Sequence, residues 1–257
     1  MSAGLRAAFV AAFCFWIYLA SAVAQIGPMF PGPGLTTVKP IQAPVSFGSA
    51  TGGNAVCPTS ATFTTSTNIV AGDFLSVFVQ YGETVTTTSV SDGTNNYVLT
   101  AHSLGGSSNW LSDVWTVTNA AAVSSGATLT VTWSGAGSGC WGYTIAGSKI
   151  SSALTASPVD VNIITNVTSF TATPTQATGT LAQTNEVIYG YEIGNGVNGG
   201  TYTESTGFTN IFNQVAGRLT SGVGYVLRPA TTSSITYAPT LGNVPNNTEV
   251  VGVLSIK

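Results

Sequence analysis

The chain has 257 residues, of which only 6% are charged. Soluble proteins usually carry about 25% charged residues, so the polar surface must consist of hydroxyl, amide and backbone groups. Hydrophobic residues make up 44% of the chain, which is enough for a buried core and excludes global disorder. A formal net charge of -3 argues against a nucleic-acid partner, which requires a basic surface.

The first 24 residues have the pattern of a secretory signal peptide. Residues 7–24 (AAFVAAFCFWIYLASAVA) are uncharged, follow Arg6, and end on the small residues Ala22 and Ala24. This pattern predicts cleavage before Gln25, and therefore a protein that is secreted, held at the cell surface or kept in the periplasm. A retained anchor is the alternative, because the apolar run is at the lower limit for spanning a bilayer. No later apolar stretch approaches that length, so we expect no stable membrane insertion after cleavage.

Export changes how Cys57 and Cys140 are interpreted, because thiols tend to pair in an oxidising compartment. We predict a disulfide between them, which would stabilise the fold by up to roughly 4 kcal/mol in the chain-entropy model. Two separate buried thiols are the alternative. These cysteines and the single His102 cannot supply four ligands at zinc-motif spacing, and we expect no cofactor.

Residues 25–56 form a Pro- and Gly-rich segment without helical periodicity, which predicts a linker or extended arm. From residue 57 to residue 257 the sequence changes to short runs of Val, Ile, Phe, Tyr, Trp and Thr, bounded by turn-forming residues. These runs predict strands. The clearest are residues 73–81, 127–133, 186–193, 208–215, 219–228, 235–237 and 249–256.

Two strand patterns carry more detail. Residues 73–81 (DFLSVFVQY) are apolar on both faces, which predicts a central strand covered on both sides. Residues 85–99 predict a strand, a turn and a second strand, with Asp92, Gly93, Asn95 and Asn96 in the turn. Turn signals repeated at this spacing predict an all-β fold, namely a single β-sandwich of jelly-roll type over residues 57–257. We find no fixed-period repeat of the kind that builds a propeller or solenoid.

Several short motifs occur along the middle of the chain: Gly72-Asp73, Ser89-Val90-Ser91-Asp92, Asn96-Tyr97, Trp115, Leu129-Thr130-Val131-Thr132, Pro158-Val159-Asp160 and Asn185-Glu186-Val187. In these segments the chain resembles a jelly-roll-like module of secreted bacterial and phage-associated proteins. The resemblance extends over roughly residues 61–256 and implies a non-catalytic surface or adhesion module.

Residues that could perform catalysis are few. His102 is the only histidine, and the chain has no Gly-x-Ser-x-Gly elbow, so a nucleophile with a neighbouring base is not indicated. Glu186 and Glu192 are six positions apart in one predicted strand, about 20 Å at the strand rise, which is too far for a glycosidase pair. Glu83, Asp113 and Glu204 could meet other carboxylates only across sheets. We therefore predict that the protein is not an enzyme.

Metal binding and ligand binding have weak candidates. Asp92, Asn95 and Asn96 supply oxygen atoms for Ca²⁺, but they lack EF-hand spacing and ordinary turn formation explains them as well. Aromatic rings on a sheet or loop can bind sugars.

The aromatic candidates are Trp110, Trp115, Trp141 and Tyr143, but packing in the core or in a hairpin is favoured over exposure, because aromatic residues are enriched in strands. Trp110, which lies beside turn residues, is the best candidate for an exposed ring.

Together these features predict a secreted binding or adhesion module for a glycan or a cell surface. The alternative is a structural, self-assembling homo-oligomer, in which the arm adds an edge strand to a neighbour through residues 35–47. An exported glycan hydrolase has the least support.

Overall fold

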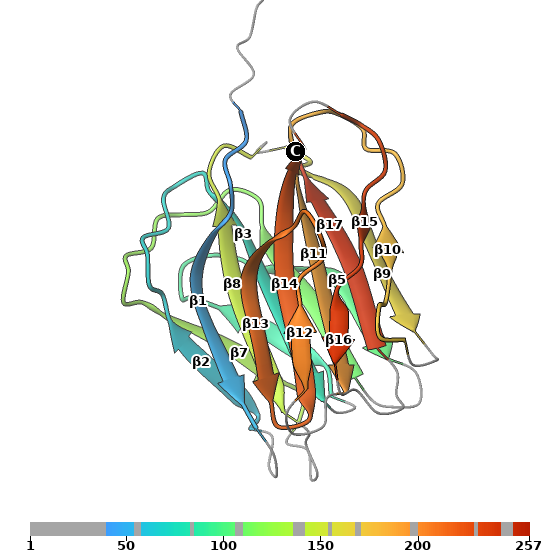
Figure 1. Ribbon diagram of the computed structural model, residues 1–257. Coiled ribbons are helices and arrows are strands. Elements are labelled where there is room, and N and C mark those ends of the chain that lie inside the picture. Colours follow the sequence, from blue (N-terminus) through green and yellow to red (C-terminus); the bar gives the residue numbers. More distant parts are fainter. Residues whose placement is uncertain are drawn as a thin grey trace, which may run out of the picture. The chain divides into compact units, whose positions relative to one another are not determined.

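A computed structural model describes residues 40–53, 58–82, 85–105, 110–135, 142–153, 156–167, 171–195, 200–228, 231–242 and 249–257. The described residues form antiparallel strands and turns and contain no helix, so the fold is all-β and of the sandwich type (Figure 1). The described part also lacks any helix that could cross a membrane.

The first half of this fold is a sandwich of a five-stranded and a three-stranded sheet. The order of the larger sheet is β1-β8-β3-β6-β5 and that of the smaller is β2-β7-β4. The strands are β1 Val45–Gly52, β2 Ser60–Thr64, β3 Phe74–Gly82, β4 Thr87–Ser91, β5 Val98–Gly105, β6 Trp110–Val117, β7 Thr128–Trp133 and β8 Tyr143–Ile150. In this half the first strand, β1, is next to the last, β8. The order β1-β8-β3-β6 in one sheet faces β2-β7-β4 in the other, which is jelly-roll connectivity.

The second half also has one five-stranded sheet, with the order β13-β14-β11-β17-β9. Two short pairs, β10 with β15 and β12 with β16, cover its outer face. The strands are β9 Val159–Val167, β10 Gln176–Ala177, β11 Glu186–Asn195, β12 Thr201–Thr203, β13 Thr209–Ala216, β14 Leu219–Arg228, β15 Thr236–Tyr237, β16 Thr240–Gly242 and β17 Glu249–Ile256. The two five-stranded sheets pack face to face within one compact unit, residues 40–257.

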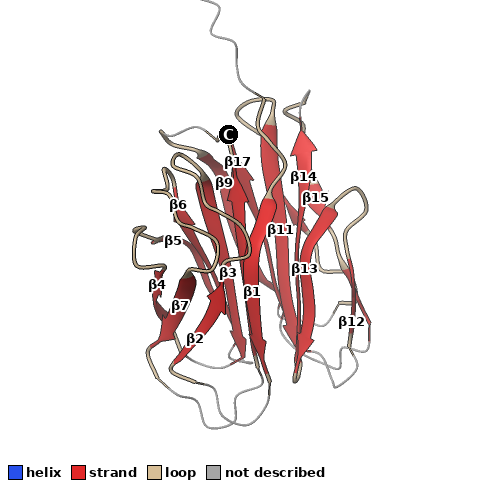
Figure 2. Cartoon of the chain, turned by 90° about the vertical axis from the view of Figure 1, so that its left-hand side faces the viewer, coloured by secondary structure: helices blue, strands red, loops and turns tan. Residues whose placement is uncertain are grey.

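Figure 2 shows the layers of strands from the side. Apolar side chains fill the spaces between successive layers. One cluster lies between the two sheets of the first half and includes Leu75, Val77 and Val131. A second cluster joins the two five-stranded sheets and includes Phe78 and Tyr191. Strand β3 supplies side chains to both clusters and is buried along its whole length, which confirms the prediction of a doubly covered central strand.

One sequence expectation differs from the structure, and another is confirmed with strand partners that the sequence did not specify. Residues 45–52, which were expected in the arm, form β1 and pair with β8 of the same chain. The strand, turn and strand predicted for residues 85–99 are present as β4, the turn at residues 92–97 and β5, but β4 pairs with β7 and β5 pairs with β6. The turn at residues 92–97 therefore carries the chain from one sheet to the other.

Candidate functional site

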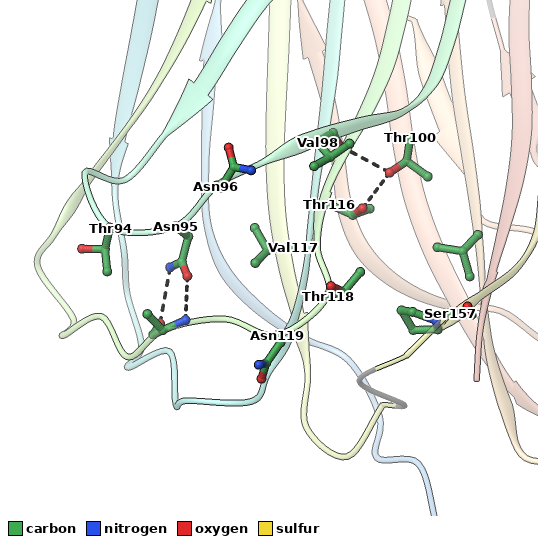
Figure 3. A pocket seen from close by; sticks show the side chains of 13 residues that line it. Thr94, Asn95, Asn96, Val98, Thr100, Thr116, Val117, Thr118, Asn119 and Ser157 are labelled. Atoms are coloured by element: carbon green, nitrogen blue, oxygen red, sulfur yellow. Dashed lines mark hydrogen bonds between the residues drawn. The ribbon is translucent and has the colours of Figure 1, made fainter.

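An open groove with a volume of about 710 Å³ lies at the end of strands β5 and β6, beside the start of β9 (Figure 3). Every residue that lines it is uncharged. The hydroxyl and amide side chains are Thr94, Asn95, Asn96, Thr100, Thr116, Thr118, Asn119 and Ser157, and the others are Val98, Val117, Ala121, Pro158 and Val159. The groove thus has hydrogen-bonding groups, which donate and accept, next to small apolar surfaces. Val98 is 57% exposed.

One wall of the groove is held by the carboxylate of Asp92. Its Oδ1 accepts the backbone N–H groups of Thr94 and Asn95 at 2.9 and 2.7 Å. Its Oδ2 accepts the Asn95 amide at 2.9 Å and the Tyr97 hydroxyl at 3.0 Å. Burial opposes ionisation, but the hydrogen bonds from Asn95, Thr94 and Tyr97 together lower the pKa of Asp92 below its ordinary value.

Asn95 connects this wall to the next loop. Its Oδ1 accepts the backbone N–H of Ala121 at 2.7 Å, and its amide nitrogen lies 3.3 Å from the Ala121 carbonyl oxygen. The oxygen atoms of Asp92 and Asn95 that were considered for Ca²⁺ are therefore engaged by protein donors. This is the turn geometry that the sequence analysis favoured for these residues, and Asn96 lines the groove.

Thr100 and Thr116 lie side by side in the groove, with their hydroxyl oxygens 2.6 Å apart (Figure 3). Thr100 is the extra residue of a β-bulge in β5, and a bulge redirects the side chain at this position. Ser157, at φ 49°, and Pro158 bring the segment before β9 to the same groove. The site therefore uses residues from both halves of the fold.

The aromatic residues predicted from the sequence lie elsewhere. Trp110 is 1% exposed and Trp115 is 9% exposed, so the prediction that they present rings to a ligand is wrong. Both strand faces of β6 are covered, and the rings fill core space. Tyr143 is half-buried and packs on Trp133, with ring centroids 5.4 Å apart. Trp141 and the predicted disulfide partners Cys57 and Cys140 lie outside the described residues.

His102 and Asp113 form a contact that the sequence did not predict. They are opposite each other in the β5–β6 pair, and His102 Nδ1 lies 2.7 Å from Asp113 Oδ1. Asp113 is 1% exposed, whereas the His102 side chain is 39% exposed. Burial raises the pKa of Asp113, and the hydrogen bond with His102 opposes this rise. Only the register of the two strands could have revealed the pair.

Two carboxylates act on the same pair of tyrosines in the second half of the fold. Glu192 of β11 is buried, and both it and Glu204 act electrostatically on Tyr202 and Tyr237. The two tyrosine hydroxyl oxygens are 2.5 Å apart. Burial raises the pKa of Glu204. Sequence reasoning named Glu204 as a residue that could meet others across sheets, but could not identify Tyr202 and Tyr237 as the residues beside it.

Glu186 is separate from this cluster and accepts a hydrogen bond from Ser255. Glu83 lies outside the described residues. The described residues contain no group of three or more His, Cys, Asp or Glu side chains placed to hold a metal ion.

Comparison of the chain with protein-family models, with curated proteins and with solved structures found no match.

Proposed function

We propose that this protein is a secreted, non-catalytic binding module that holds a neutral glycan in the groove formed by β5, β6 and the start of β9. The observation that carries the proposal is the lining of the groove: eight hydroxyl or amide side chains and no charged one. A sugar offers hydroxyl groups that donate and accept hydrogen bonds, and threonine and asparagine can match both roles.

The shape and rigidity of the groove also support a binding role. Its volume of about 710 Å³ is within the range of roughly 300–1,000 Å³ that ligand sites occupy. The Asp92 and Asn95 hydrogen bonds fix one wall before any ligand arrives. A pre-ordered wall reduces the entropy that binding would otherwise lose. The signal-peptide pattern adds secretion to the proposal, because it predicts export.

The alternative, assembly through the arm, loses part of its proposed strand. Residues 45–47 already belong to β1, which pairs with β8 of the same chain. The rest of the run, residues 35–44, includes Pro40 and Pro44, and proline restricts pairing to strand edges.

The test is retention of the mature protein, from Gln25 onward, on an array of neutral and charged polysaccharides, with its mass measured by light scattering. We expect retention of a monomer on neutral glycans. Thr118 and Asn119 are exposed in the groove, so T118A/N119A should weaken retention at least about tenfold, or 1.4 kcal/mol. The control is Thr62→Ala, on the exposed face of β2.

Retention that is unchanged in T118A/N119A would show that the groove is not the site. Large assemblies without retention on any polysaccharide would instead support the structural alternative.

A further inference from the structure

The two halves of the fold have the same strand order. The larger sheet of the first half is β1-β8-β3-β6-β5, and that of the second is β9-β17-β11-β14-β13. Adding eight to each of the first six strand numbers of the first half gives its counterpart in the second. Strand β8 corresponds to β17, and β7 corresponds to the short strands β15 and β16. The smaller sheet follows the same rule, since β2-β7-β4 corresponds to β10-β15 and β16-β12.

The strand register of the two halves also agrees at a β-bulge that both halves contain. Strands β5 and β13 each carry a β-bulge, and the extra residue is Thr100 in the first half and Ile211 in the second. Two positions before the bulge, Val98 of β5 is paired with Thr116 of β6, and Thr209 of β13 is paired with Tyr225 of β14. Bulges are conserved within protein families, so a bulge at the same place in both halves supports their common descent.

The same register matches Asp73, before β3, with Glu186, at the start of β11. Asp73 lies 3.3 Å from the Lys149 ammonium group of β8. Glu186 accepts a hydrogen bond from Ser255 of β17. Lys149 and Ser255 are each the residue before the end of their strand. Each half therefore has its own carboxylate at the same position of the sheet, and the carboxylate contacts a different residue in each half.

The halves pack about an approximate twofold axis. Strand β5 lies beside β9, and β1 lies beside β13. Because β9 corresponds to β1 and β13 to β5, exchanging the halves exchanges these two contacts. The two central strands meet near the axis, where the Phe78 ring centroid is 5.3 Å from that of Tyr189 and 5.4 Å from that of Tyr191. This is the geometry of an isologous dimer within one chain.

We infer that the chain is an internal duplication of one jelly-roll module, and that the groove is the place where the two copies diverged. The groove is open in the first copy because Thr100 and Thr116 stand where the second copy has Ile211 and Tyr225. Ile211 and Tyr225 are partly buried and pack against the core between the five-stranded sheets. The larger side chains occupy the position that the two threonines leave to a ligand.

The consequence for ligand binding rests on the proposed function: each chain should bind one glycan, and Thr100 and Thr116 should determine whether it can enter. The test is T100I/T116Y in the full mature chain, which gives the first copy the residues of the second. The matched control is T62I/T130Y, because Thr62 and Thr130 are paired across β2 and β7 in the other sheet.

We expect T100I/T116Y to fold, with a melting temperature at or above that of the wild type, and to lose glycan retention at least about tenfold. T62I/T130Y should retain the glycan as the wild type does. A crystal structure of T100I/T116Y should show the tyrosine ring in the groove.

The outcomes separate the two proposals. If the wild type is retained on no polysaccharide, the proposed function is wrong. The melting temperature and crystal structure of T100I/T116Y would still test whether Thr100 and Thr116 are equivalent to Ile211 and Tyr225. If T100I/T116Y binds as well as the wild type, the inference that Thr100 and Thr116 control entry to the groove is wrong. If T100I/T116Y unfolds, and the single variants Thr100→Ile and Thr116→Tyr unfold too, the two copies do not share this position.

Discussion

Asp92 organises the turn beside the groove because its two carboxylate oxygens accept hydrogen bonds from four donors. The donors are the N–H groups of Thr94 and Asn95, the Asn95 amide and the Tyr97 hydroxyl. Burial raises the pKa of Tyr97, and the charge and hydrogen bond of Asp92 raise it further. Asp92 is a turn-forming residue by type, but the sequence could not show that Tyr97 and the loop at Ala121 complete the arrangement.

Replacing Asp92 by alanine should therefore be costly. Asp92→Ala leaves the buried Tyr97 hydroxyl and two backbone N–H groups without this acceptor, and each such loss costs about 1–3 kcal/mol when the donor is buried. We expect the free energy of unfolding to fall by roughly 2–4 kcal/mol in urea titration. Asn96→Ala, on the exposed side of the same turn, is the control. Equal stability of the two variants would contradict this role of Asp92.

At the scale of the elements, glycines allow the short outer strands to lie directly on the second five-stranded sheet. A Cβ added at Gly190 of β11 would overlap the ring of Tyr237 in β15, and one at Gly222 of β14 would overlap Tyr202 in β12. Close approach of backbone to a ring is a common reason for glycine within a strand. The sequence shows these glycines inside predicted strands but not the rings that cover them.

Gly190→Ala should force β15 away from the sheet. We expect it to lower the free energy of unfolding by about 1–3 kcal/mol, because the added methyl group overpacks a closed contact. Gly135→Ala is the matched control, since a Cβ at Gly135 would meet open space. Calorimetry of both variants makes the comparison, and no difference between their melting temperatures would show that β15 can move without cost.

At the scale of the whole molecule, buried carboxyl groups in several layers should make stability depend on pH. Burial raises the pKa of Asp113, Glu186 and Glu204, whereas the pKa of Asp92 is lowered. A raised folded-state pKa contributes stability at low pH that is lost as pH rises through the raised value. The lowered pKa of Asp92 acts in the opposite sense, and its contribution is lost on acidification.

Glu204→Gln should isolate one of these groups. The folded-state pKa of Glu204 is raised above its ordinary value of 4.5, so the wild type should lose stability relative to E204Q as pH rises from about 4 to about 7. Urea unfolding of both proteins across this range measures the difference. A difference that stays constant with pH would show that Glu204 titrates normally, and a difference in the opposite direction would show that its pKa is lowered.

The strands, their turns and the buried nature of β3 could be predicted from the sequence, because alternation and turn residues are local signals. Strand β14 occupies the predicted residues 219–228, and β17 covers the predicted residues 249–256. The jelly-roll type was also predicted, whereas the shared strand order of the two five-stranded sheets was not. Their sequences have diverged, so the duplication is visible in strand order and register rather than in a repeated motif.

The sequence by itself determined which segments form strands, which faces of those strands are apolar, and that charge plays little part in the surface. Only the tertiary structure decided that Trp110 is buried, that His102 meets Asp113, and that Thr100 and Thr116 open into a groove with Ser157. The physical reason is that alternation specifies the face of a strand but not its partner. Contacts between residues far apart in the chain depend on the register and on the order in which the sheets stack.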